Sequence, residues 1–110
     1  MALAVIMGAF AAHALKHFFD QYATDVFKTG NFYHFIHSLA LIMVGILQQQ
    51  FDIDLNISGY SFFFGMVIFS GSLYALALTG IKGLGAITPI GGGLFILGWG
   101  WLAIQFYKST

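Results

Sequence analysis

Four histidines, arranged in two pairs, are the side chains that could do chemistry in this sequence. His13 and His17 are one helical turn apart, with Lys16 between them. His34 and His37 form the second pair, and each spacing places two imidazoles on one helix face, as a metal ion or a haem iron requires. Imidazole titrates near pH 6.5, so a proton or solute relay is a further alternative. We prefer a structural interpretation, in which these residues bond between helices or reach the membrane interface.

Motifs for other chemistry are absent from the sequence. It has no cysteine, which excludes thiolate metal sites, iron–sulfur ligation and cysteine nucleophiles. It also has no phosphate-binding loop, no nucleophile elbow and no paired carboxylates within an apolar stretch. We therefore expect no catalytic residue, no metal and no cofactor, and we expect that the protein is not an enzyme.

The composition of the chain indicates the environment of the elements that carry the histidines. Of the 110 residues, 59% are hydrophobic and only 7% are charged, whereas soluble domains carry about 25% charge. Such a chain cannot cover a soluble domain with polar surface, so the lipid bilayer is its expected environment. The formal net charge is zero, and without a basic face we expect no nucleic-acid partner.

Four apolar stretches predict an all-α fold, an integral membrane four-helix bundle in one domain that covers residues 1–110. The predicted spans are about 2–19, 32–47, 60–78 and 87–107. A helix needs about 20 residues to cross a bilayer, so the first two spans are short. Residues 20–31 combine an apolar helical pattern with Asp and Lys, which is typical of a short amphipathic segment at the interface after the first helix.

The chain must reverse direction between these stretches. Gly80 is placed to end the third helix, and Thr88 with Pro89 to begin the fourth, so these two helices are expected to form an antiparallel hairpin. The chain also reverses between the histidine pairs. We therefore expect both pairs at one depth, with His13 and His37 as neighbours.

Lysine placement predicts the orientation of the four spans. Lys16, Lys28 and Lys82 fall in the first and third connections, on one side of the membrane. Lys108 is the one lysine on the other side, next to the C-terminus. The positive-inside rule then places both termini away from the cytoplasm.

Small and polar residues predict how the helices pack. Repeats of four or seven residues mark faces where helices approach closely, within one chain or between protomers. The residues expected on these faces are Gly8, Gly71, Ala75, Gly91 and Gly98. The third stretch also carries a row of polar side chains, which we expect to hydrogen-bond to carbonyl groups of their own helix. They are Ser70, Ser72, Tyr74 and Thr79. An interfacial aromatic belt is expected from Trp99, Trp101 and Tyr107.

Four segments together resemble a known family. They are GAFAAHALK at 8–16, YHFIHSLAL at 33–41, FSGSLYALALTG at 69–80 and GAITPIGG at 85–92. Over nearly its whole length the chain is similar to uncharacterised protein family 0382, or domain of unknown function 423, which is related to the vertebrate transmembrane protein 256. The resemblance implies a multi-pass protein of the bacterial inner membrane and carries no established activity. His13, Lys16 and His37 fall at motif positions, whereas His17 does not.

Two functions follow as hypotheses from different classes. The preferred one is a structural or accessory membrane protein that acts as a homo-oligomer or as a subunit of a larger membrane complex. The alternative is a small-solute or proton conduit that uses the histidine-rich end of the first two helices. The first predicts stoichiometric co-purification, and the second predicts flux through the isolated protein.

Overall fold

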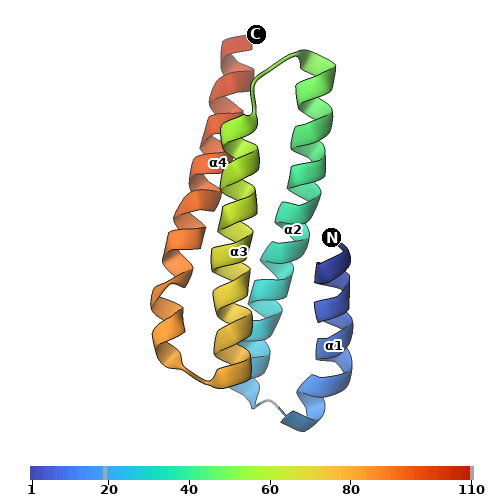
Figure 1. Ribbon diagram of the computed structural model, residues 1–110, viewed down its shortest axis with the longest axis vertical. Helices are drawn as coiled ribbons and strands as arrows, with labels where there is room; N and C mark the ends of the chain where they lie inside the picture. Colours follow the sequence, from blue (N-terminus) through green and yellow to red (C-terminus); the bar gives the residue numbers. More distant parts are fainter. Residues whose placement is uncertain (19, 110) are drawn as a thin grey trace.

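The computed structural model describes the backbone of residues 1–18 and 20–109, and the side chains of residues 1–13 and 20–108. The described backbone is helical and contains no strand. Its elements are α1 (Ala2–Phe18), α2 (Gln21–Phe51), α3 (Asn56–Thr79), the short 3₁₀ helix η1 (Lys82–Ala86) and α4 (Thr88–Ser109) (Figure 1). The predicted all-α class is confirmed.

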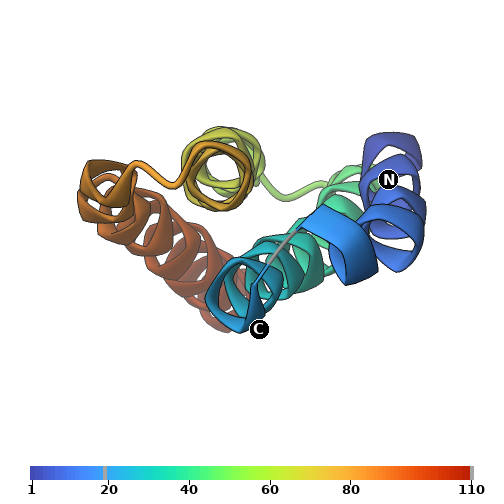
Figure 2. The same cartoon turned by 90° about the horizontal axis from the view of Figure 1, so that it is seen from below.

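The three long helices run up and down beside one another, and α1 joins them from one side. α3 packs against both α2 and α4, whereas the described part of α1 packs against α2. Viewed from the end, α4 lies on one side of α3 and α2 on the other, and α1 lies beyond α2 (Figure 2). The molecule measures 51 × 26 × 15 Å, which is long enough to cross a bilayer of about 30 Å hydrocarbon thickness.

Helix α2 corrects the prediction for residues 20–31. The Asp20 side chain caps its first turn by accepting a 2.8 Å hydrogen bond from the Ala23 backbone N–H. From there the helix continues without a break to Phe51. The predicted amphipathic segment is therefore helical, but it forms the first turns of α2, and the predicted span 32–47 is the apolar part of that longer helix.

Three of the described helices are long and apolar enough to cross a membrane. They are α2, α3 and the stretch from η1 through α4, Lys82–Lys108. α1 has 17 residues, and its apolar part, Ala2–His13, is shorter than a span. In Figure 1, α1 accordingly lies beside only the first part of α2.

Glycine ends α3 and opens the turn toward α4. Gly80 has the left-handed conformation (φ 73°), and its N–H donates a 2.8 Å hydrogen bond to the Leu76 carbonyl. Glycine adopts this conformation without steric cost, which is why it commonly follows a helix. α4 then begins at Thr88, with Pro89 in its first turn. The expected hairpin of α3 and α4 is confirmed.

Glycines also set how closely α3 and α4 approach. At three of them an added Cβ would lie less than 3 Å from a neighbouring side chain or backbone atom, so the hydrogen atom is what permits the contact. These are Gly65 against the ring of Phe95, Gly91 against the backbone of Phe69, and Gly98 against the ring of Phe62.

The other predicted packing residues have different surroundings. Gly8 lies at the contact of α1 with α2, where an added Cβ would be 3.1 Å from Oδ1 of Asn31. Gly71 is exposed, and no atom of the described chain lies within 4 Å of the corresponding position. Ala75, one turn later, is half-buried. Gly71 is therefore not part of a contact between the described helices, because α3 turns this face outward.

Candidate functional site

The His37 side chain of α2 reaches side chains of α4. Its Nδ1 is 2.9 Å from the Tyr33 carbonyl oxygen, and its Nε2 is 3.0 Å from Nε1 of Trp99. A carbonyl oxygen only accepts and an indole N–H only donates. These partners therefore define a neutral imidazole, with Nδ1–H donating to Tyr33 and Nε2 accepting from Trp99.

Aromatic rings enclose the His37 side chain, which is 3% exposed. The Phe95 ring stacks on it at a centroid distance of 3.5 Å and an angle of 8°. Phe62 meets it edge-on at 5.3 Å. A cavity of about 500 Å³ between α2 and α4 is lined by His37, Tyr33, Phe95 and Trp99, among others. His37 therefore presents mainly ring surface to this cavity, because both of its nitrogens are engaged.

His34 belongs to a separate hydrogen-bond network that joins three helices. Its Nδ1 is 2.9 Å from the Tyr74 hydroxyl of α3. The Asn31 amide donates to the same hydroxyl at 3.1 Å and to the Ala4 carbonyl of α1 at 2.9 Å. Because the hydroxyl accepts from Asn31, its own proton is available for Nδ1 of His34. The network ties α1, α2 and α3 together one helical turn before His37.

The structure separates His13 from His37. Ala11 of α1 belongs to the same buried cluster as Phe27 of α2, so His13 is exposed near the level of Phe27. His37 lies ten residues beyond Phe27 on α2, which corresponds to about 15 Å along the helix. The expected proximity of His13 and His37 is therefore wrong, because α2 begins at Gln21 and the chain reverses earlier than predicted.

Two members of the predicted cluster cannot be placed by their contacts. The side chains of Lys16 and His17 fall within residues 14–19, outside the described side chains. Among the side chains that are described, no group of three or more His, Cys, Asp or Glu residues could hold a metal ion. Of the predicted cluster, His34 and His37 are buried. His34 bonds to a side chain of α3, and His37 bonds to a side chain of α4.

The sequence interpretation missed the partners that complete these contacts. The Trp99 N–H donates to His37 of α2, a contact that the prediction of an interfacial belt does not include. Ser70 was expected to bond within its own helix, but its hydroxyl donates to the Gly30 carbonyl of α2 at 2.7 Å. Hydrogen-bond donors and acceptors inside apolar stretches indicate that such contacts exist. The spacing of residues within one helix does not reveal their partners on another helix.

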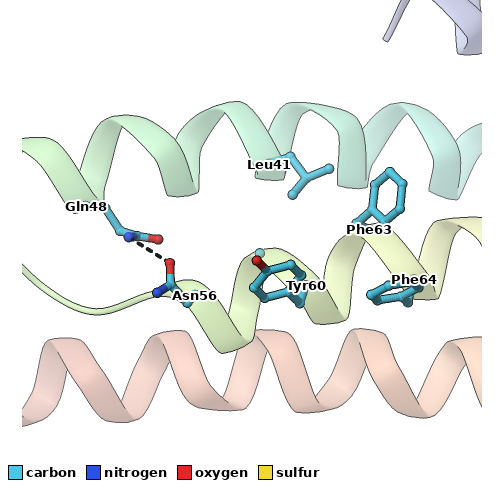
Figure 3. A pocket seen from close by; sticks show the side chains of 7 residues that line it. Leu41, Gln48, Asn56, Tyr60, Phe63 and Phe64 are labelled. Atoms are coloured by element: carbon cyan, nitrogen blue, oxygen red, sulfur yellow. Dashed lines mark hydrogen bonds between the residues drawn. The ribbon is translucent and has the colours of Figure 1, made fainter.

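A second pocket lies between α2 and α3, near the loop that joins them (Figure 3). It has a volume of about 350 Å³. At one end the Gln48 amide donates a 3.2 Å hydrogen bond to Oδ1 of Asn56. The remainder is lined by Leu41, Gly59, Tyr60, Phe63 and Phe64. The pocket is therefore polar at the loop and largely apolar along the helices.

Comparisons with known proteins agree with an apolar helical fold in a membrane. The family described as "Protein of unknown function (DUF423)" matches residues 7–92. The UPF0382 membrane protein of Staphylococcus saprophyticus is 46% identical over 96% of this chain and 88% of its own length. The corresponding protein of Staphylococcus aureus (strain bovine RF122) is 44% identical over 96% of this chain and 87% of its own. No solved structure matches the chain. The chain thus belongs to the DUF423 family, and like its UPF0382 relatives it is a membrane protein.

Proposed function

We propose that this protein is a structural or accessory component of the bacterial inner membrane, which it crosses several times, and that it is not an enzyme. It acts as a homo-oligomer or as a subunit of a larger membrane complex. The relatives' names support a membrane location, and the three long apolar helices support a multi-pass arrangement.

The observation that carries this proposal is the bonding of the two buried histidines. His37 joins α2 to α4 through Trp99, and His34 joins α2 to α3 through Tyr74. Polar side chains inside membrane bundles commonly bond helices to one another in this way. A binding or relay site needs groups that are free to exchange partners, whereas both nitrogens of His37 are already engaged.

Open glycine positions on α4 support association with another helix. Gly93 and Gly100 are exposed and lie seven residues apart. Apart from the backbone of α4 itself, an added Cβ at either position would meet no atom of the described residues within 4 Å. A second helix could approach α4 closely at these positions. The other protomer, or a different membrane protein, would supply that helix.

The test is co-purification from membranes that express two differently tagged copies. After extraction in a mild detergent, capture of one copy should recover the other, or a different protein at constant stoichiometry. Gly93→Leu and Gly100→Leu should reduce this recovery. Gly71→Leu, an exposed glycine on α3, is the matched control and should not. Recovery of only monomeric captured protein would contradict the proposal.

The conduit hypothesis is tested separately in liposomes loaded with a pH-sensitive dye. We expect the purified protein to leave the proton permeability of the vesicles unchanged. His37→Gln and His34→Gln keep hydrogen-bonding capacity but cannot carry a proton near neutral pH. Proton flux that the parent supports and either variant lacks would favour the conduit over the structural role.

A further inference from the structure

The residues that line the pocket between α2 and α3 change from apolar to polar along the helices, in the direction from the expected membrane core to the interface. Leu41, Phe63 and Phe64 line its apolar part (Figure 3). Gln48 lies seven residues beyond Leu41, or about 10 Å along the helix axis, where the apolar part of α2 ends. The pocket thus begins at the interface and extends toward the hydrocarbon core.

Within the part of the chain whose side chains are described, the amide pair at the mouth retains hydrogen-bonding groups that no neighbour uses. The bond from Gln48 Nε2 to Asn56 Oδ1 leaves the Asn56 amide protons as donors and Gln48 Oε1 as an acceptor. Both residues line the pocket, and Asn56 is exposed. An oxygen-rich group at this depth, such as the phosphate and ester region of a lipid, could accept from Asn56.

Two carboxylates shortly precede Asn56 in the sequence. Asp52 and Asp54 are both exposed on the loop that joins α2 to α3. The Asp54 carboxylate accepts a 3.0 Å hydrogen bond from the Asn56 backbone N–H, which fixes it beside the mouth. Described cations at this end of the molecule are confined to Lys108, near the end of α4. The loop beside the mouth therefore carries two exposed carboxylates and faces few described cations.

We propose that this pocket, formed by Leu41, Gln48, Asn56, Gly59, Tyr60, Phe63 and Phe64, binds a phospholipid with a primary ammonium headgroup. The order of apolar wall, amide pair and carboxylates matches the order of acyl chain, phosphate and ammonium in such a lipid. A primary ammonium donates hydrogen bonds to carboxylates, which a quaternary ammonium cannot do, and an anionic headgroup would be repelled. The site is independent of whether the protein forms oligomers.

The experiment uses the full chain in nanodiscs that contain equal amounts of phosphatidylethanolamine, phosphatidylcholine and phosphatidylglycerol with identical acyl chains. The protein is released into mild detergent, and retained lipids are identified by native mass spectrometry. We expect phosphatidylethanolamine to be enriched over the other two lipids. Each carboxylate should contribute about a two- to fivefold preference, the range expected of an exposed ion pair.

Variants separate the headgroup contacts from the acyl-chain contacts. Asp52→Asn and Asp54→Asn keep an oxygen acceptor and remove the charge, so the headgroup preference should fall while lipid is still retained. Gly59→Leu places a side chain in the pocket and should reduce retention of all three lipids. Gly71→Leu changes an exposed glycine of the same helix outside the pocket and should leave retention unchanged.

Three results would overturn the proposal. One is equal retention of the three lipids by the parent, which means general contact with the surrounding bilayer. The second is enrichment of phosphatidylcholine or phosphatidylglycerol. The third is equal loss of lipid in Gly59→Leu and Gly71→Leu, which would place the retained lipid elsewhere on the molecule.

Discussion

His37 is held in one tautomer by two partners of opposite kind. A proton added to Nε2 would face the Trp99 N–H, so the two side chains would have to separate before the ring could carry a second proton. The stacked Phe95 ring restricts that movement, because the two centroids are 3.5 Å apart. The neutral ring therefore serves as a fixed link between α2 and α4.

The first prediction removes the donor of this link. Trp99→Phe keeps an aromatic ring but leaves Nε2 of His37 without its partner, so the free energy of unfolding should fall by about 1 kcal/mol. The measurement is helicity by circular dichroism during titration of mixed micelles with SDS. Trp101→Phe is the matched control, because the Trp101 N–H lies 3.4 Å from the Asp54 carbonyl in an exposed position.

A smaller loss in Trp99→Phe than in Trp101→Phe would contradict the assignment of His37 as a helix link. Trp99→Phe with His37→Phe is a further test. The double variant lacks both partners of the hydrogen bond. Removing both lowers the free energy of unfolding less than removing the donor alone, because no buried acceptor is left unsatisfied. It should therefore be more stable than Trp99→Phe alone.

At the residue scale, the sequence shows which polar side chains lie inside apolar helices, but it does not show their hydrogen-bond partners. The spacing of His34 and His37 correctly places both on one helix. Their partners, Tyr74 and Trp99, lie 40 and 62 residues further along the chain. Such contacts depend on helix register, which is set by packing on several helices at once and is not a property of any single stretch.

At the scale of elements, α2 shows why a local pattern was misleading. Gly30 and Asn31 are the last residues of the segment 20–31, which the sequence pattern predicts to be an amphipathic connection. In the structure they are contact residues within the helix. The Gly30 carbonyl accepts from Ser70, and the Asn31 amide bonds to both neighbouring helices. At about 46 Å the 31-residue helix exceeds the hydrocarbon thickness, so its charged first turns can extend into the interface, as expected of an amphipathic segment.

The second prediction concerns the close approach of α3 and α4. Gly91→Ala should lower the free energy of unfolding by about 1–3 kcal/mol, because the added Cβ would lie 2.5 Å from the Phe69 backbone nitrogen. Gly71→Ala, in open surroundings on α3, should be neutral or slightly stabilising. Unfolding of both variants in SDS would be compared, and equal stability would show that the Gly91 contact is absent in the membrane.

The third prediction tests which residues of α2 and α3 lie opposite one another. A Cβ built at Gly30 lies 3.1 Å from Cβ of Leu73, near the 3.5–4.5 Å of a disulfide. Gly30→Cys with Leu73→Cys should therefore form a crosslink on mild oxidation, seen as a mobility shift that a reductant reverses. The parent has no cysteine to interfere.

The matched control is the pair His13→Cys with His37→Cys, which should remain uncrosslinked because about 15 Å of helix separates their levels. A crosslink between positions 13 and 37 without one between 30 and 73 would restore the shorter α2 expected from the sequence. It would also bring the two histidine pairs back to one depth.

At the scale of the whole molecule, the described lysines are distributed unevenly between the two ends. Lys82 begins η1, where α3 turns toward α4, and Lys28 belongs to the first turns of α2. α2 begins at the same end of the molecule as this turn (Figure 1). The opposite end carries one described lysine, Lys108, and Asp residues lie at both ends. Lysines close to membrane spans are retained on the cytoplasmic side, whereas acidic residues have little influence. This difference involves only the three long helices, so it does not depend on whether α1 crosses the bilayer.

The last prediction is that the C-terminus faces away from the cytoplasm. A reporter that is active only in the cytoplasm should be inactive when fused after Thr110 and active when inserted beside Gly83 in η1. Lys28→Gln and Lys82→Gln, combined with Gln49→Lys and Gln50→Lys, move the positive charge to the other end and should reverse both signals. Reporter activity after Thr110 in the parent would show that lysine placement does not set the orientation. The packing of α2, α3 and α4 is the same in either orientation, so that outcome would leave the fold unchanged and move the acidic mouth of the proposed lipid site to the cytoplasmic leaflet.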